Sequence, residues 1–222
     1  MKICFAHGLS AEAAEKLSQF GVDMIDPCPC GAQLAHSDLY VHITPEKRFF
    51  VAANSSDSAK GFPEAIVIDS QVGSAYPFDV PLNCVCIGKS LFCNKNTVSS
   101  SLLTYYTDLN YNIINVNQGY AKCSVVPLGD SLITDDDSIA SAAERNGISY
   151  LKVSKGNVRL KGYAYGFIGG SAGVCDNTVF WNGDIASHPE CDIILDYIRQ
   201  NGFRSVNLTD GELYDIGSLL FS

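Results

Sequence analysis

The sequence is short of positive charge and of long apolar runs. Its 222 residues include 15 lysines and arginines against 24 aspartates and glutamates, a formal net charge of −9. This imbalance disfavours binding to nucleic acid or to an anionic membrane. No stretch approaches the roughly 18 apolar residues of a membrane span, and residues 1–10 (MKICFAHGLS) lack the apolar core of a secretion signal. We therefore expect a cytoplasmic protein whose partners are neither nucleic acid nor membrane.

The cysteines lack the spacing of a structural metal site. There are nine, an odd number without a secretion signal, which indicates reduced thiols. Two Cys-x-Cys pairs occur, Cys28/Cys30 and Cys84/Cys86, whereas zinc sites usually space their thiols by about two to four residues. The segment NCVCIG is typical of a strand, with both thiols on one face, and free cysteine packs as a small apolar residue. We expect core packing there, and neither a metal nor a cofactor.

What the sequence does contain is a repeated pattern of strand, strand, helix and strand. With 46% apolar residues, the chain is long enough to bury a core as one domain over residues 1–222. Segments beginning at Cys84, Cys123 and Cys175 each indicate a strand, a Gly-containing turn and a second strand. The turns are predicted at Gly88-Lys89, Gly129-Asp130 and Asn182-Gly183.

A helix is predicted after each hairpin, followed by another strand. Asp137 is the expected N-cap of a helix within residues 137–147. Ser187 and Glu190 form an expected capping box for a later helix. That capping box explains Glu190 without a catalytic role for it or for the neighbouring His188.

The two ends of the chain complete one unit between them. Residues 2–26 supply a strand, a helix and a strand, and residues 215–222 (DIGSLLFS) supply the missing first strand. Pairing the two terminal strands closes a ring of five units and removes an exposed sheet edge. The predicted units span about 217–26, 36–69, 84–118, 123–156 and 175–210, the second with a loop in place of its helix.

This unit, its number and the unit shared by the two ends resemble the pentein fold. The resemblance covers essentially the whole chain and looks closest to a bacterial branch of the family. It implies an α/β fold class, a five-bladed β/α propeller of ββαβ repeats closed by the N- and C-terminal strands. The family includes enzymes that modify guanidino groups and a non-enzymatic ribosome anti-association factor.

In such a ring, the positions just before each first strand converge on the axis. Titratable groups gathered at one mouth are candidates for function, although small polar residues also suit a narrow pore with no function. These positions are His36-Ser37-Asp38, Cys84, Lys122-Cys123, Cys175-Asp176 and Asp215 to Ser218.

Two of these segments resemble catalytic motifs of the guanidino-modifying penteins. AHSDLYVHI resembles their His-x-Asp motif, and GYAKCSV resembles their Cys after a Gly-rich stretch. The resemblance implies His36 as the general acid/base, Asp38 as a substrate carboxylate and Cys123 as the nucleophile. The further candidates for substrate contact are Asp176, Asp215, Cys84, Gly169 and Gly170.

One departure from the pattern leaves two interpretations open. The enzymes commonly carry Glu before a Gly-Gly pair, but FIGGSAG places Ile168 there, and isoleucine does not bind a guanidinium. Cys123 is therefore either a nucleophile or a packed strand residue. The first interpretation predicts a cysteine-dependent hydrolase or amidinotransferase acting on a small guanidine or amidine cation. The second predicts a non-catalytic binding protein; the net charge disfavours contact with RNA or the ribosome.

Overall fold

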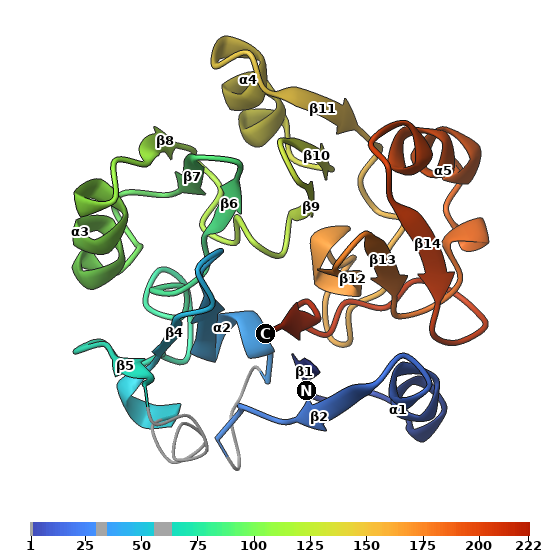
Figure 1. The fold of residues 1–222 in the computed structure, drawn as a ribbon, viewed down its shortest axis with the longest axis horizontal. Coiled ribbons are helices and arrows are strands. Elements are labelled where there is room, and N and C mark those ends of the chain that lie inside the picture. The colour runs from blue at the N-terminus through green and yellow to red at the C-terminus, as the bar shows by residue number, and fades with distance from the viewer. Residues whose placement is uncertain (1, 30–34, 56–63) are drawn as a thin grey trace.

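The described part of the chain forms five three-stranded sheets set around a common centre (Figure 1). The computed structural model describes residues 2–29, 35–55 and 64–222. The sheets, each in spatial order, are β15 (Leu220–Phe221), β1 (Lys2–Phe5) and β2 (Val22–Ile25); β3 (Val41–Ile43), β4 (Phe49–Val51) and β5 (Ile66–Val67); β6 (Val85–Ile87), β7 (Ser90–Cys93) and β8 (Asn112–Asn115); β9 (Val125–Leu128), β10 (Ser131–Thr134) and β11 (Ser149–Lys152); and β12 (Ala172–Cys175), β13 (Thr178–Trp181) and β14 (Arg204–Asn207).

All five sheets share one pairing pattern. The middle strand is antiparallel to the first strand and parallel to the third. Helices α1, α3, α4 and α5 lie outside the sheets, and the first strands lie toward the centre (Figure 1). The helices are α1 (Ala11–Ser18), α2 (Ser37–Tyr40), α3 (Ser100–Asp108), α4 (Asp137–Arg145) and α5 (Cys191–Gln200), with short 3-10 turns at Ala53–Ser55, Gly169–Ser171 and Ile185–Ser187.

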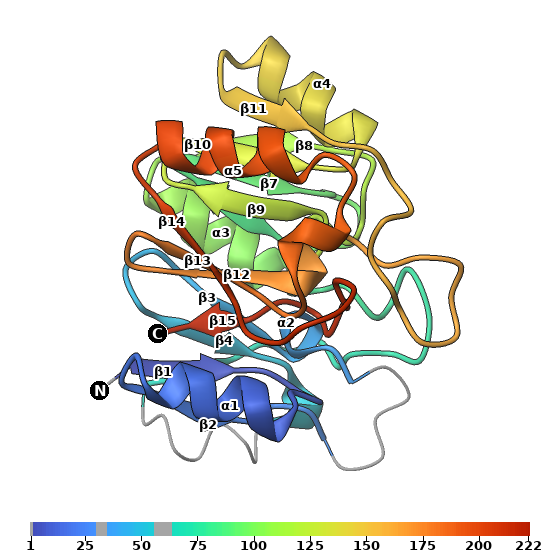
Figure 2. The ribbon, with the colours of Figure 1, turned by 90° about the vertical axis from the view of Figure 1, so that its right-hand side faces the viewer.

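The predicted pairing of the terminal strands is confirmed. β1 and β15 are antiparallel, with Cys4 opposite Phe221 and Phe5 opposite Leu220. The two chain ends lie close together in both views (Figures 1 and 2). The predicted fold class, a five-bladed β/α propeller of pentein type, is likewise confirmed. Within the described residues, every helix is too short or too polar to cross a bilayer.

Apolar side chains fill the spaces between neighbouring sheets. Phe221 packs on Phe180 of β13 with ring centroids 5.5 Å apart, so the last strand joins the fifth sheet to the first. The indole of Trp181 is fully buried and donates its N–H to Ser205 Oγ at 2.9 Å. Each sheet thus depends on its neighbours for burial of its faces.

The third predicted hairpin turn is wrong. β12 ends at Cys175 and β13 begins at Thr178, so the turn is Asp176-Asn177 rather than Asn182-Gly183. Asp176 has the left-handed φ of 50° that such a turn needs. The first strand of this sheet is therefore AGVC, and the segment before it is Gly169–Ser171.

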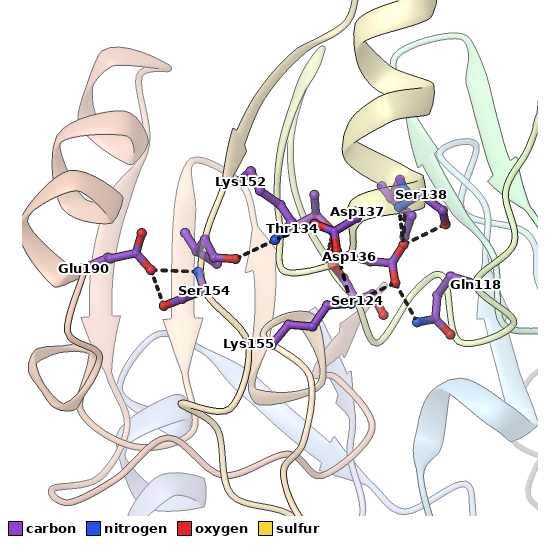
Figure 3. Close-up of polar contacts among 12 residues, drawn as sticks. Gln118, Ser124, Thr134, Asp136, Asp137, Ser138, Lys152, Ser154, Lys155 and Glu190 are labelled. Atoms are coloured by element: carbon purple, nitrogen blue, oxygen red, sulfur yellow. Dashed lines mark hydrogen bonds and ion pairs between the residues drawn. The ribbon is translucent and has the colours of Figure 1, made fainter.

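The two predicted helix caps are also corrected (Figure 3). Asp136, not Asp137, caps α4, because its Oδ1 accepts N–H bonds from Ser138 at 2.8 Å and from Ile139 at 3.1 Å. No capping box precedes α5, which begins at Cys191. The Glu190 carboxylate instead accepts the Ser154 N–H at 2.7 Å. The loop predicted in the second unit lies largely outside the described residues.

Candidate active site

The segments before the first strands meet at one end of the axis. His36 precedes the short helix α2, which carries Asp38 and leads directly into β3. Cys123 comes two residues before β9. The ligating atoms of His36, Asp38 and Cys123 all lie within 4.8 Å of one another, and all three residues are buried. The structure therefore brings together the three residues predicted to be catalytic.

The carboxylate of Asp38 is the centre of this cluster. Its Oδ2 accepts the Cys123 thiol at 2.8 Å and lies 2.9 Å from Ser218 Oγ. Ser218 Oγ is also 2.9 Å from the Gly169 carbonyl, so its single proton serves one acceptor at a time. Asp38 Oδ1 is buried and has no hydrogen-bond partner among the described residues. A buried carboxylate oxygen without a donor is free to bind one that a ligand brings.

Asp215 lies behind His36. Its Oδ1 is 3.8 Å from His36 Nδ1. The backbone N–H groups of Phe167 and Gly217 each donate to this carboxylate at 2.9 Å. Asp215 was predicted to contact substrate, and its carboxylate lies beside the His36 imidazole and lines the same cavity as Cys123.

The Gly169-Gly170 pair makes close packing around the cluster possible. A Cβ on Gly170 would lie 2.0 Å from Asp215 Oδ1, and one on Gly169 would lie 2.3 Å from the Val125 carbonyl oxygen. The Gly170 N–H also donates to the Cys123 carbonyl at 2.7 Å. Asp215 thus lies directly beside the Gly-Gly pair. This chain therefore has a carboxylate next to the pair, although Ile168 stands where the enzymes commonly carry Glu.

Asn83 is a site residue that sequence reasoning missed. Its Nδ2 lies 3.4 Å from Cys123 Sγ, and its Oδ1 accepts the Lys122 N–H at 2.8 Å. It is buried directly before Cys84. Asn83 does precede a first strand, as the predicted site residues do. It was missed because the candidates were sought among titratable side chains, and asparagine has none.

The thiol is protonated in the resting site. Burial raises the pKa of Cys123 well above its ordinary value, and the carboxylates of Asp38 and Asp215 raise it further. Burial also raises the pKa of Asp215. A thiolate would add negative charge beside two carboxylates, so forming it requires a positive charge close to Sγ.

Cys123 faces a cavity of about 280 Å³ with largely aromatic walls. The Tyr120 and Phe167 rings stack with centroids 6.0 Å apart, and the Tyr120 hydroxyl donates to Asp79 Oδ2 at 2.6 Å. Aromatic faces and nearby carboxylates attract cations. The lining residues are His36, Tyr120, Cys123, Leu160, Tyr163, Ala164, Tyr165, Phe167 and Asp215.

Cys84 and Asp176 face a different cavity, of about 460 Å³. The Cys84 thiol lies 3.5 Å from His42 Nδ1, and His42 Nε2 is 2.6 Å from the Tyr106 hydroxyl. Burial lowers the pKa of His42 to about 4, so its imidazole is neutral. The structure thus places Cys84 in a hydrogen-bonded chain outside the Cys123 cavity.

Asp176 is not brought to Cys123. Its side chain is 68% exposed in the β12–β13 turn and pairs with Lys2. It follows β12 whereas Gly170 precedes it, so the two residues lie at opposite ends of one strand. The expectation that Asp176 contacts substrate depended on the misplaced hairpin turn.

The five sheets and the polar cluster on their axis define the chain as a pentein-fold protein. It belongs to a family of unknown function, DUF6873, whose model matches residues 6–220. The search for similar curated proteins gives no match.

Several solved structures share this fold at low sequence identity. A mutant dimethylarginine dimethylaminohydrolase from Pseudomonas aeruginosa, complexed with citrulline, is 8% identical with a TM-score of 0.56; the match covers 92% of this chain and 91% of that one. An arginine dihydrolase from the ornithine–ammonia cycle in cyanobacteria is 13% identical with a TM-score of 0.57, over 93% of this chain and 36% of that one. An amidinotransferase from Microseira wollei is 10% identical with a TM-score of 0.52, over 87% and 72%.

Proposed function

We propose that this protein is a cysteine-dependent enzyme that hydrolyses a small guanidine or amidine cation or transfers its amidino group. The observation that supports it most is the meeting of Cys123, His36 and Asp38 within 4.8 Å beside a cavity of about 280 Å³. The structural relatives support it too, since by name they are a dimethylaminohydrolase, an arginine dihydrolase and an amidinotransferase.

A guanidinium is the ligand that best suits the resting site. Asp38 Oδ1 is buried without a donor among the described residues, and Asp215 lines the cavity that Cys123 faces. A planar guanidinium supplies N–H groups in the geometry that carboxylates accept. The cation also opposes the effect of the two carboxylates on Cys123, so its arrival lowers the pKa of the thiol. The substrate thus helps to generate its own nucleophile.

The reaction then runs in two halves. Cys123 passes its proton to His36, and Sγ attacks the amidino carbon. The C–N bond to the leaving amine breaks as His36 returns the proton to that nitrogen, leaving an S-linked thiouronium. Water, or a second amine in a transferase, attacks the same carbon while His36 accepts its proton. The C–S bond breaks, and Cys123 is regenerated as a thiol. Asp215 stabilises the imidazolium in both halves.

Selective labelling of the thiol tests this proposal. Chloroacetamidine, a cationic guanidinium mimic, should alkylate Cys123 much faster than the neutral chloroacetamide, as read by peptide mass spectrometry. Guanidine compounds should slow the reaction by competition. Cys123→Ser should abolish labelling, whereas the matched variant Cys84→Ser, which removes a thiol beside His42, should retain it. Equal labelling of several cysteines, or equal rates for the two reagents, would contradict the proposal.

The raised pKa of Cys123 favours a second candidate, a protein that binds a small cation without turnover. Both candidates predict saturable binding of guanidine compounds by calorimetry. Only the enzyme releases an amine or ammonia when a panel of guanidino compounds is incubated with it. Binding without release from any member would leave the binding protein as the function.

A further inference from the structure

We infer a metal site, separate from the Cys123 cavity, in which His7, Asp26 and Cys28 bind Zn²⁺. The ligating atoms of these three residues all lie within 4.8 Å of one another. They supply an imidazole, a carboxylate and a thiol, three ligand types found in zinc sites. The expectation from spacing alone was that Cys28 packs in the core.

The fold places the three side chains together. β1 and β2 are parallel, with Phe5 opposite Ile25, so the chain leaves both strands at the same edge. The Ala6 N–H donates to the Ile25 carbonyl at 3.1 Å and extends this pairing by one residue. His7 and Asp26 follow at once, and Cys28 lies two residues further on.

Hydrogen bonds connect the three residues of the cluster. His7 Nδ1 lies 2.7 Å from Asp26 Oδ2, and the Cys28 N–H donates to Asp26 Oδ1 at 2.9 Å. Pro27 and Pro29 flank Cys28 and fix the backbone φ on either side of it. Few rotations remain to be frozen when the three ligands close on an ion.

The chemistry of the donors selects zinc. Thiolate and imidazole together suit a borderline-soft ion and disfavour Mg²⁺ and Ca²⁺, which take oxygen ligands. Three protein ligands leave a fourth tetrahedral position for water. The His7 and Asp26 side chains are 41% and 51% exposed, so an ion reaches the site from solvent. Binding replaces the Cys28 thiol proton by the metal.

The site is adjacent to the proposed catalytic segment. Cys28 packs against the apolar cluster that includes Leu39 and Tyr40. These two residues follow Asp38 in α2. A zinc ion on Cys28 would therefore lie close to the helix that carries Asp38.

Cobalt provides a spectroscopic test on the full reduced, metal-free chain. Co²⁺ should bind one ion per chain, with a thiolate charge-transfer band in the near ultraviolet and tetrahedral bands in the visible, and Zn²⁺ should displace it. Cys28→Ser should remove the charge-transfer band. His7→Ala, a change at an exposed side chain, should weaken binding by at least about 10-fold. Circular dichroism of the metal-free variants checks that they fold.

The controls separate this site from the second cluster of possible metal ligands among the described residues. Cys123→Ser changes the His36, Asp38 and Cys123 group and should leave the band intact. Cys191→Ser, which removes a partly exposed thiol beside Asp192, should also have no effect. A band that survives Cys28→Ser but disappears in Cys123→Ser would overturn the inference, as would wild-type protein that gives no thiolate band with Co²⁺.

Discussion

Replacing Asp135 by asparagine should change how stability depends on pH. Asp135 is buried, its Oδ2 accepts the Ile168 N–H at 3.1 Å, and its Oδ1 has no partner among the described residues. Burial raises its pKa from 3.8 to about 7. Asparagine keeps an oxygen to accept the same N–H and removes the charge that burial disfavours.

The raised pKa of Asp135 determines the direction and the size of the change in folding stability with pH. Because the pKa of Asp135 is higher in the folded than in the unfolded chain, its proton stabilises the fold. That contribution is complete below the unfolded pKa of 3.8 and is lost as the pH rises to about 7. A shift of this size at about 1.4 kcal/mol per pH unit amounts to about 4 kcal/mol. Asp135→Asn should therefore be more stable than the wild type at pH 8, by up to that amount, and similar to it near pH 4.

Urea unfolding followed by circular dichroism between pH 4 and pH 8 measures this difference. Asp137→Asn is the matched control, since the Asp137 side chain is 83% exposed and its removal should leave the wild-type slope unchanged. A loss of stability between pH 4 and pH 7 that is as steep in Asp135→Asn as in the wild type would contradict this prediction.

Three further changes probe the site and the ring. Gly170→Ala forces a Cβ to within 2.0 Å of Asp215 Oδ1; it should cost about 1–3 kcal/mol of stability and slow chloroacetamidine labelling, and unchanged melting would count against it. Asn83→Ala removes a donor that lowers the pKa of Cys123, so the midpoint of the pH profile of alkylation should move up, not down. Phe221→Ala should lower stability by about 3–5 kcal/mol in thermal melts, because its ring joins the first and fifth sheets; a loss below about 1 kcal/mol would refute this.

The sequence predicted the ring because its signals are local and repeated. Glycine turns and alternating apolar residues mark the hairpins. The units at the two chain ends are each incomplete, which indicated that their strands pair with each other. The failure at the third hairpin has a physical cause. In GGSAGVC, Gly173 lies in β12 because β15 packs against it, and a Cβ there would meet the Leu219 carbonyl oxygen at 2.2 Å. A strand built of small residues resembles a loop in sequence, so Asp176 was assigned to the wrong end of it.

The motifs and the ring predicted which segments meet at the candidate site, but not the contacts within it. His36, Asp38 and Cys123 stand in recognisable motifs, and the ring brings them together. The ring predicted Ser218 near the axis, but its contact with Asp38, like that of Asn83 with Cys123, could not be read from the sequence. Ser218 adopts a left-handed φ of 64°, unusual for a serine, and this conformation accompanies the approach of its hydroxyl to Asp38.

The segment that carries Cys123 separates two cavities, and the thiol faces only one of them. Lys122 and Cys123 are neighbours, yet Lys122 lines the cavity of about 460 Å³ and Cys123 the cavity of about 280 Å³. Asp38 lines the larger cavity and accepts the thiol that faces the smaller one. The hydrogen bond between Asp38 and Cys123 thus forms part of the wall between the two cavities. Tyr163 and Tyr165 line the cavity that Cys123 faces, so changes to this aromatic segment should alter the selectivity of the thiol.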